Sequence, residues 1–342
     1  MNLAGESVPA VRFGALGAAK ITPLALLSPA RLVPGVTVNA VAARDPLLAR
    51  KFAARHSIPI VYESYEALLD STEVDAIYLP LPNSLHCEWT KRALAAGKHV
   101  LCEKPLAANA QEAREMEAAA QANDRVLCEA FHYRYHPLAA RIKQIVASGQ
   151  LGQIQEMEAH LNTNVLNPRD IRFSFPLGGG ALMDTGSYTV NLLRYLAGAE
   201  PRVVSARARC LTPQIDRWME AELEFPGGIS ARLTCSILSS IICRWLVIVR
   251  GSEATMRVIN PIRPYRRHRI TITRGKVSRQ ETVPGNGTTF KYQLEAFVAA
   301  VTGRGPIQTS AADAVRNLEV IDQIYRVAGL RPRGTENCPG SD

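Results

Sequence analysis

The sequence predicts an α/β protein with two domains: a doubly wound parallel sheet followed by a domain built on an antiparallel sheet. Its 342 residues exceed what one ordinary core holds, since domains run to about 100–200 residues. Short apolar runs alternate with helical patterns over residues 11–131, and beyond residue 137 strand patterns follow one another without helices between them. Alternating strands and helices are typical of parallel sheets, and consecutive strands are typical of antiparallel ones.

Six buried strands are expected in the first domain, because each run is brief, β-branched and bounded by Gly, Pro or charge. They occupy residues 11–16, 36–43, 59–62, 75–82, 98–103 and 125–131. Helical spacing predicts helices over residues 46–56 and 85–97, with Gly97 as a C-cap. Ligands of such sheets gather at the carboxyl ends of the strands.

The second domain is expected to begin with a helix over residues 136–149. Strands are predicted over residues 153–165, 201–210, 216–225, 229–238, 244–251 and 268–275, and helices over residues 289–301 and 311–328. We place the first domain at residues 8–131 and the second at residues 132–330. Residues 331–342 are interpreted as a flexible tail.

Composition excludes several classes of protein. Hydrophobic residues make up 47% and charged residues 21%, which is typical of a globular protein. No signal-peptide pattern and no apolar run of membrane-spanning length is seen, so we expect a soluble, cytoplasmic protein with no membrane partner. The seven cysteines contain no C-x-x-C pair, which favours buried, reduced thiols, and no ligand spacing indicates a metal.

The formal net charge of +9 would suit nucleic acid or an anionic small molecule. Basic residues are spread along the chain, and the densest group, residues 263–269, is interpreted as a solvated strand or loop. We therefore expect no nucleic-acid partner; such binding would show a steep dependence on salt.

A phosphate-binding turn is predicted directly after the first strand. It comprises Gly17, Ala18, Ala19, Lys20 and Ile21, with Ala19 where the fingerprint G-x-G-x-x-G has its second glycine. In such a turn, backbone amides at a helix N-terminus bind the pyrophosphate of a dinucleotide. The fingerprint is weak alone, but its place in the first crossover of an alternating pattern favours nucleotide binding over an ordinary turn.

The residues at the end of the second strand indicate whether the cofactor is NADP or NAD. A carboxylate there binds the ribose hydroxyls of NAD, whereas an arginine pairs with the 2′-phosphate of NADP. Arg44 follows Ala42 and Ala43, which favours NADP. Asp45 stands one residue later and keeps NAD as the alternative cofactor.

Several longer segments together resemble the Gfo/Idh/MocA oxidoreductase family. They are NAVAARD (39–45), LPLPNSLHCEWTKRALAAGKHVLCEKPLA (79–107), EAFHYRYHP (129–137) and GGGALMDTGSYTVNLLRYLAG (178–198). Within the family, the chain looks most like the dimeric trans-dihydrodiol dehydrogenase and D-xylose dehydrogenase branch. The resemblance implies an N-terminal Rossmann domain and a C-terminal α/β domain with an open, mostly antiparallel sheet that binds substrate. It also implies a homo-oligomer, either a dimer or a tetramer.

The resemblance implies roles for individual residues as well. It puts the pyrophosphate on the turn 17–21 and the adenosine end near Arg44. Asn83 and His86 match the family's P-N-x-x-H loop, which lines the nicotinamide half of the cofactor. Glu103 and Lys104 belong to its E-K-P motif, whose lysine projects into the active site. Both are expected to contact the cofactor; the alternative for Glu103 is that it anchors the turn instead of the cofactor ribose.

The family motif D-x-G-x-H/Y matches Asp184 and Tyr188. Many members, including those of the inositol dehydrogenase type, have histidine where this chain has Tyr188, so an inositol substrate is disfavoured. Four residues apart on a helix, Asp184 and Tyr188 share one face. The alternative interpretation without the resemblance is a helix cap and a half-buried tyrosine.

Transfer of hydride between an alcohol and nicotinamide needs a group that takes or gives the hydroxyl proton. Tyrosine and lysine have ordinary pKa values near 10 and 10.4, so action near pH 7 needs a shift of about three pH units. We expect Tyr188 to donate and accept the proton, and Lys104 to orient the substrate oxygen and lower the tyrosine pKa. The reverse assignment of roles is also open.

Substrate contacts are expected from two segments, because a sugar or polyol needs several hydrogen-bond partners. The candidates are His132, Tyr133 and Arg134, and Arg169, Asp170 and Arg172; the alternative is that they form surface loops. The predicted function is an NADP-preferring oxidoreductase that interconverts a secondary alcohol and a carbonyl on a sugar, polyol or cyclic diol. The alternatives are an NAD-dependent sugar or inositol-like dehydrogenase and a catalytically silent NAD(P)-binding regulator.

Overall fold

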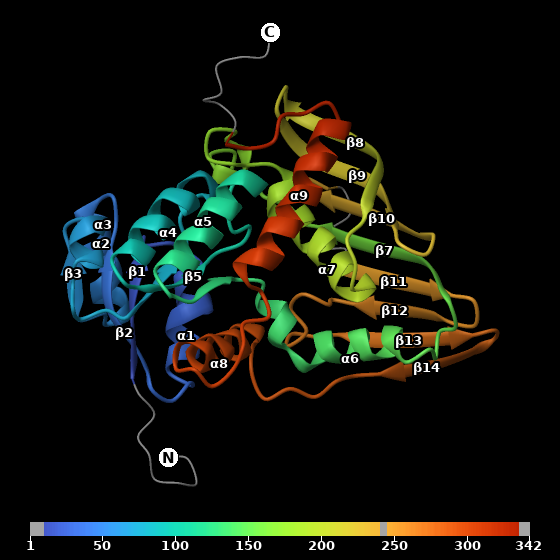
Figure 1. The fold of residues 1–342 in the computed structure, drawn as a ribbon, viewed down its shortest axis with the longest axis horizontal. Helices are drawn as coiled ribbons and strands as arrows, with labels where there is room; N and C mark the ends of the chain where they lie inside the picture. Colours follow the sequence, from blue (N-terminus) through green and yellow to red (C-terminus); the bar gives the residue numbers. More distant parts are fainter. Residues whose placement is uncertain (1–9, 240–244, 335–342) are drawn as a thin grey trace.

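The computed structural model describes residues 10–239 and 245–334. The strands of this part of the chain form two sheets, one of six strands and one of eight (Figure 1). The first sheet is entirely parallel. In the second sheet, neighbouring strands are antiparallel except for the strands over residues 154–162 and 229–236, which are parallel to each other. The prediction of a doubly wound parallel sheet followed by a mostly antiparallel one is therefore confirmed.

The N-terminal sheet has the strand order β3-β2-β1-β4-β5-β6. Its strands are β1 (Val11–Leu16), β2 (Val36–Ala42), β3 (Ile60–Tyr62), β4 (Ala76–Leu79), β5 (His99–Cys102) and β6 (Leu127–Glu129). Its helices and helical turns are η1 (Pro23–Leu27), α1 (Ser28–Ala30), α2 (Pro46–His56), α3 (Tyr65–Leu69), η2 (Asn83–Leu85), α4 (His86–Ala95) and α5 (Ala110–Ala122). The order reverses between β1 and β4, and doubly wound sheets bind ligands at such a point.

Short polar side chains start the helices of this domain. Asp45, Ser64 and Asn109 each accept a hydrogen bond from a backbone amide of the first turn of α2, α3 and α5, which satisfies a donor that the helix itself leaves unpaired. Gly97 follows α4 with a φ of 76°, so its predicted place at the helix end is confirmed.

The C-terminal sheet has the strand order β14-β13-β12-β11-β7-β10-β9-β8. Its strands are β7 (Ile154–Asn162), β8 (Arg202–Thr212), β9 (Ile215–Phe225), β10 (Ile229–Ser236), β11 (Trp245–Gly251), β12 (Thr255–Ile259), β13 (Arg269–Arg274) and β14 (Val277–Glu281). The accompanying helical segments are η3 (His132–Tyr135), α6 (Pro137–Ala147), η4 (Ile171–Phe173), η5 (Leu182–Gly186), α7 (Ser187–Ala197), α8 (Thr289–Val301) and α9 (Ala311–Val327). The sequence did not predict β12 and β14.

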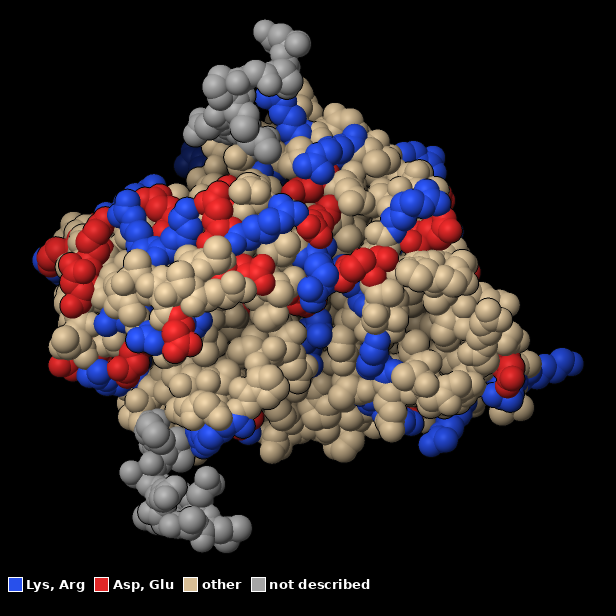
Figure 2. All heavy atoms as spheres, viewed as in Figure 1, with Lys and Arg blue, Asp and Glu red and all other residues tan. Residues whose placement is uncertain are grey.

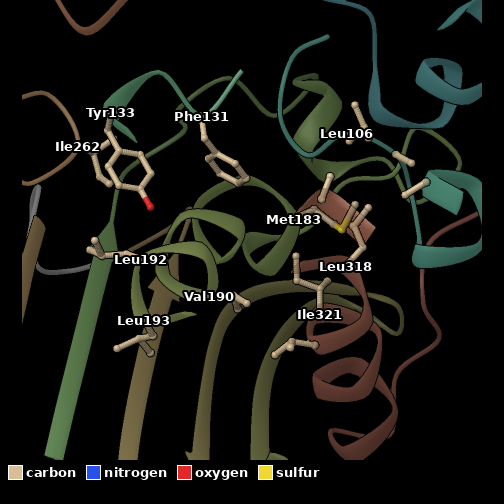
Figure 3. Close-up of a cluster of buried hydrophobic side chains, with 14 of the residues drawn as sticks. Leu106, Phe131, Tyr133, Met183, Val190, Leu192, Leu193, Ile262, Leu318 and Ile321 are labelled. Carbon is tan, nitrogen blue, oxygen red and sulfur yellow. The ribbon is translucent and has the colours of Figure 1, made fainter. Parts of the chain in front are cut away.

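The last two helices return to the N-terminal part of the molecule (Figure 1). Phe297 of α8 packs on Phe13 of β1, with ring centroids 5.6 Å apart, and α9 packs against both α5 and α7. Figure 3 shows part of the resulting core, in which side chains of α7 and α9 belong to one hydrophobic cluster with Leu106, which follows β5. Helix α8, assigned by sequence to the second domain, thus covers the first sheet.

Residues 331–334 differ from the flexible tail expected there. Arg333 is fully buried, and its backbone oxygen accepts a hydrogen bond of 2.8 Å from Asn109 Nδ2. Residues 8–9 of the expected first domain and 335–342 of the tail lie outside the described residues.

Acidic and basic side chains interleave over the face shown in Figure 2. Among the described cysteines, Cys87, Cys102, Cys128 and Cys235 are buried as expected and Cys210 is exposed. In the described ranges, no helix is both long and apolar enough to cross a bilayer.

Candidate active site

A cleft of about 530 Å³ lies where the end of β5 faces the start of the η5–α7 helix and the end of β7. This volume is within the range of about 300–1,000 Å³ that is usual for small-molecule sites. Predicted site residues that line it are Ile21, Asn83, Glu103, Lys104, His132, Asp170, Arg172, Asp184 and Tyr188. The remaining lining residues include Asn164, Asn167, Trp245, Arg263 and Phe290.

Lys104 reaches across the cleft to the helix that carries Asp184. Its Nζ donates to the Asp184 backbone oxygen at 2.8 Å and lies 3.1 Å from Asp184 Oδ1. The other carboxylate oxygen, Oδ2, accepts from Arg172 Nε at 2.8 Å, and Arg172 also pairs with Asp170 at 2.9 Å. Burial would raise the pKa of Asp184, but Lys104 and Arg172 outweigh it and lower that pKa to about 2. Asp184 is therefore a carboxylate at neutral pH.

Tyr188 lies beside Lys104. Lys104 Nζ is 4.8 Å from the centre of the Tyr188 ring, and the Tyr188 hydroxyl is 3.3 Å from His132 Nε2. Burial, followed by the charge of Glu103, raises the pKa of Tyr188 well above its ordinary value. This direction is opposite to the lowering that we expected from Lys104, because burial and the negative charge of Glu103 dominate.

His132 is a buried, neutral partner of the tyrosine. Its ring packs on Phe290 with centroids 4.1 Å apart, and its Nδ1 has no hydrogen-bond partner in the described structure. Burial, then the charges of Arg263 and Lys104, lower the pKa of His132 well below its ordinary value. A neutral imidazole can either accept from a phenol or donate to it.

The turn after β1 has the geometry of a phosphate cradle. Gly17 has a φ of 115°, a conformation that favours glycine, and its amide donates to Ala42 O at 2.7 Å. The next four residues, Ala18 to Ile21, donate no backbone hydrogen bond to described residues, so their amides are available to an anion. The residues present thus fit a dinucleotide pyrophosphate.

Arg44 and Asp45, the two residues expected to decide between NADP and NAD, have different roles in the structure. Asp45 Oδ1 accepts from Leu47 N at 2.9 Å and caps helix α2. Arg44 is exposed at the end of β2, and its side chain forms no ion pair with a described carboxylate. The arginine is therefore available to a phosphate while the carboxylate is engaged.

The P-N-x-x-H loop contributes one residue to the cleft. Asn83 Nδ2 donates to Gly178 O at 2.9 Å and ties this loop to the segment before Asp184. His86 is fully buried, with its ring nitrogens 2.9 Å from Pro105 O and 2.8 Å from Leu81 O. Contrary to our expectation of a cofactor contact, the His86 side chain holds the turn after β5, where the Lys104–Pro105 peptide bond is cis.

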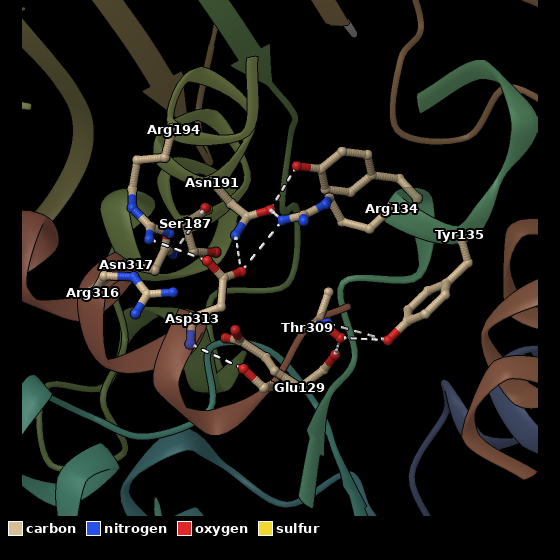
Figure 4. Close-up of polar contacts among 12 residues, drawn as sticks. Glu129, Arg134, Tyr135, Ser187, Asn191, Arg194, Thr309, Asp313, Arg316 and Asn317 are labelled. Atoms are coloured by element: carbon tan, nitrogen blue, oxygen red, sulfur yellow. Dashed lines mark hydrogen bonds and ion pairs between the residues drawn. The ribbon is translucent and has the colours of Figure 1, made fainter. Parts of the chain in front are cut away.

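Two expected substrate contacts point away from the cleft. Arg134 Nη1 lies 3.3 Å from Asp313 Oδ2 (Figure 4). The Arg134 guanidinium also stacks over the ring of Tyr195, 4.0 Å from its centre. The hydroxyl of fully buried Tyr133 donates to Asn191 Oδ1 at 2.6 Å. Both side chains therefore help to hold helix α7 in place, because Tyr133 bonds to Asn191 and Arg134 stacks on Tyr195, and both of these partners belong to α7. Arg169 is exposed and does not line the cleft.

Arg263 and Trp245 are among the cleft residues that the sequence did not predict. The sequence predicts that Arg263 belongs to a solvated basic segment, residues 263–269, of which Arg266, Arg267 and Arg269 are exposed. Its guanidinium instead lies 5.2 Å from the centre of the Trp245 ring, inside the cleft. The buried Pro261 and Pro264 around it were the only local signal that this arginine differs from its neighbours.

Comparison with known proteins agrees with this arrangement. Residues 11–131 match the oxidoreductase family with an NAD-binding Rossmann fold, and residues 139–257 match the GFO/IDH/MocA C-terminal domain. The chain belongs to the Gfo/Idh/MocA oxidoreductase family. This membership confirms the predicted resemblance and the prediction of a nicotinamide-dependent enzyme.

Relatives within the Gfo/Idh/MocA family act on sugars and diols. D-xylose 1-dehydrogenase (NADP(+)) 2 of Haloferax volcanii is 33% identical, covering 92% of this chain and 97% of the relative. Trans-1,2-dihydrobenzene-1,2-diol dehydrogenase of Danio rerio is 31% identical over 86% and 89%. The structure of KijD10, a 3-ketoreductase from Actinomadura kijaniata in complex with NADP and TDP-benzene, superimposes with a TM-score of 0.86 at 28% identity over 94% and 98%.

Proposed function

We propose that this protein is an NADP-preferring oxidoreductase that interconverts a secondary alcohol and a carbonyl on a sugar, polyol or cyclic diol. The observation that carries the proposal is the convergence of Lys104, Asp184 and Tyr188 in one cleft, with Lys104 bonded to Asp184. The H. volcanii and D. rerio relatives, named for xylose and for a cyclic diol, support this range of substrates.

The preference for NADP rests on Arg44 and Asp45. Arg44 is exposed beside the phosphate turn and Asp45 is engaged as a helix cap, so the strand end offers a cation and no free carboxylate. An arginine there pairs with a 2′-phosphate. The NADP in the KijD10 complex and in the name of the H. volcanii enzyme supports the same choice.

The chain's residues supply proton transfer and orientation. Bound nicotinamide would supply or accept the hydride. When a carbonyl is reduced, its carbon gains the hydride and its oxygen takes the proton of the Tyr188 hydroxyl; in alcohol oxidation the proton returns to Tyr188. The raised pKa of Tyr188 keeps the phenol protonated for the donor role.

Lys104 orients the substrate oxygen in this proposal. An ammonium has three N–H donors, and two of them are engaged by Asp184. The third is available to the substrate oxygen beside Tyr188. Asp184 and Arg172 fix the position of the ammonium through the ion pairs described above.

Tyr188→Phe and Lys104→Ala test the proposal. Each is expected to lower kcat by about 100-fold or more without changing the Kd for NADP, because neither residue belongs to the phosphate turn. Turnover is followed by NADPH absorbance with a panel of aldoses, inositols and diols, using NAD and NADP separately. Tyr292→Phe, the same change outside the cleft, is the control.

Near-normal turnover in both variants would refute the assigned roles. Tight NADP binding by the unaltered protein, with no turnover of any member of the panel, would instead favour a silent NADP-binding regulator.

A further inference from the structure

Arg263 is a cation of the cleft that no described carboxylate neutralises. Lys104 and Arg172 both pair with Asp184, and Arg172 pairs with Asp170 as well. The remaining acid of the cleft, Glu103, accepts a hydrogen bond of 2.7 Å from Tyr78. The Arg263 guanidinium makes no hydrogen bond or ion pair with residues 10–239 or 245–334, and its one specific contact is the face of Trp245.

The main chain that presents Arg263 is fixed in place. Asn260, with a φ of 53°, accepts from Arg263 N at 3.1 Å and donates to Arg263 O at 2.8 Å and to Arg267 O at 2.7 Å. Pro261, Ile262 and Pro264 beside it are buried. The side chain therefore starts from a rigid turn, and stacking on Trp245 orients the guanidinium further.

Arg263 also lies within electrostatic reach of the reacting end of the cleft. After burial, its charge is the largest cause that lowers the pKa of His132, and it opposes the rise in the pKa of Tyr188. Partial burial removes water from the Arg263 guanidinium, and without an anion to replace that water the charge destabilises the folded protein. Its planar fork of N–H donors matches a carboxylate or a phosphate.

We propose that Arg263, stacked on Trp245, forms an anion subsite for a carboxylate or phosphate group carried by the sugar substrate. This inference rests on the proposed function and narrows the substrate class to acidic or phosphorylated sugars. A neutral sugar has no group that would neutralise Arg263. The cofactor phosphates have their own cradle at residues 17–21, which comes from the other sheet.

The test compares Arg263→Gln with Arg266→Gln, which removes the same charge from an exposed residue of the same loop. The probes are D-glucose, D-glucuronate and D-glucose 6-phosphate and the three galactose counterparts, each with NADP or NADPH as the direction of reaction requires. We expect the unaltered protein to prefer the anionic probes.

Arg263→Gln should lower kcat/KM for the anionic probes by about 10- to 100-fold. It should leave kcat/KM for the neutral probes and the Kd for NADP unchanged. A preference for uronates identifies the anion as carboxylate, and one for the 6-phosphates identifies it as phosphate.

A second measurement separates this inference from the proposed function. Quenching of tryptophan fluorescence by the same probes, with NADP bound, measures binding without relying on turnover, and Trp245 is the one of the three tryptophans that lines the described cleft. Anion-selective quenching that Arg263→Gln abolishes would support the subsite even if nothing is turned over. Equal binding of neutral and anionic probes, or an effect of Arg263→Gln on NADP alone, would overturn the subsite and leave the proposed oxidoreductase standing.

Discussion

At the scale of single residues, the state of Tyr188 follows from what surrounds its hydroxyl. The hydroxyl faces neutral His132 at 3.3 Å, while the ammonium of Lys104 faces the ring. Burial, followed by the charge of Glu103, raises the pKa of Tyr188 and keeps the phenol protonated. His132 is therefore the residue that can hold the Tyr188 hydroxyl in position.

His132→Phe and His132→Gln test this positioning role. Phenylalanine keeps the packing on Phe290 but removes the nitrogen partner of Tyr188, whereas glutamine places a polar group near the position of Nε2. We expect His132→Phe to lower kcat by about tenfold, the value of one hydrogen bond, and His132→Gln to lower it less. The pH profile of kcat should change in His132→Phe, while the Kd for NADP stays constant. An unchanged kcat and pH profile in the phenylalanine variant would refute the role.

At the scale of elements, the helix that carries Asp184 and Tyr188 is held at its start by a buried ion pair. Asp216 Oδ2 accepts from Leu182 N at 2.7 Å, and Asp216 Oδ1 lies 2.7 Å from Arg333 Nη2. Arg333 Nε donates to Gly179 O at 2.6 Å. At Gly180, whose φ is 126°, a Cβ would come within 2.2 Å of Asp216 Oδ1, so this position requires glycine.

Arg333→Met should destabilise the fold strongly. It leaves Asp216 buried without its partner, and breaking a buried pair in this way costs about 3–5 kcal/mol. The free energy of unfolding, measured by urea titration, should fall by this amount, while Arg331→Met, the same change in an exposed neighbour, should leave it almost unchanged. Adding Asp216→Asn to Arg333→Met should recover part of the loss. A loss as small as that of Arg331→Met would show that the pair does not hold the helix.

Local patterns predicted most elements, and the failures have physical causes. The six parallel strands are apolar runs that need no partner to be recognised, whereas β14, with the sequence VSRQE, is exposed along most of its length and lacks a buried face. Lys104, Asp184 and Tyr188 were identified because short motifs carry them. Arg134 and Arg263 could not be told apart by residue type, since only tertiary packing places one against Asp313 and the other in the cleft.

At the scale of the whole molecule, the segment before α9 joins the C-terminal part of the chain to the last strand of the first sheet. Thr309 O accepts from Glu129 N at 2.9 Å, and Thr309 Oγ1 donates to Glu129 O at 2.6 Å (Figure 4). The Glu129 carboxyl is fully buried at this junction. Its Oε1 accepts from Leu106 N at 2.8 Å, and its Oε2 has no partner in the described structure.

This junction should make the stability of the protein depend on pH. Burial, followed by the charge of Asp313, raises the pKa of Glu129 from 4.5 to about 8, so the folded protein holds a proton that the unfolded chain loses at lower pH. The contribution of the protonated Glu129 carboxyl to the free energy of unfolding is therefore fully present below about pH 4.5. It falls as pH rises toward 8, by an amount of the order of 2–5 kcal/mol. Glu129→Gln, which cannot ionise, should flatten this fall. Urea titrations at intervals between about pH 5 and pH 9 measure it, and parallel curves for the two proteins would contradict a protonated Glu129.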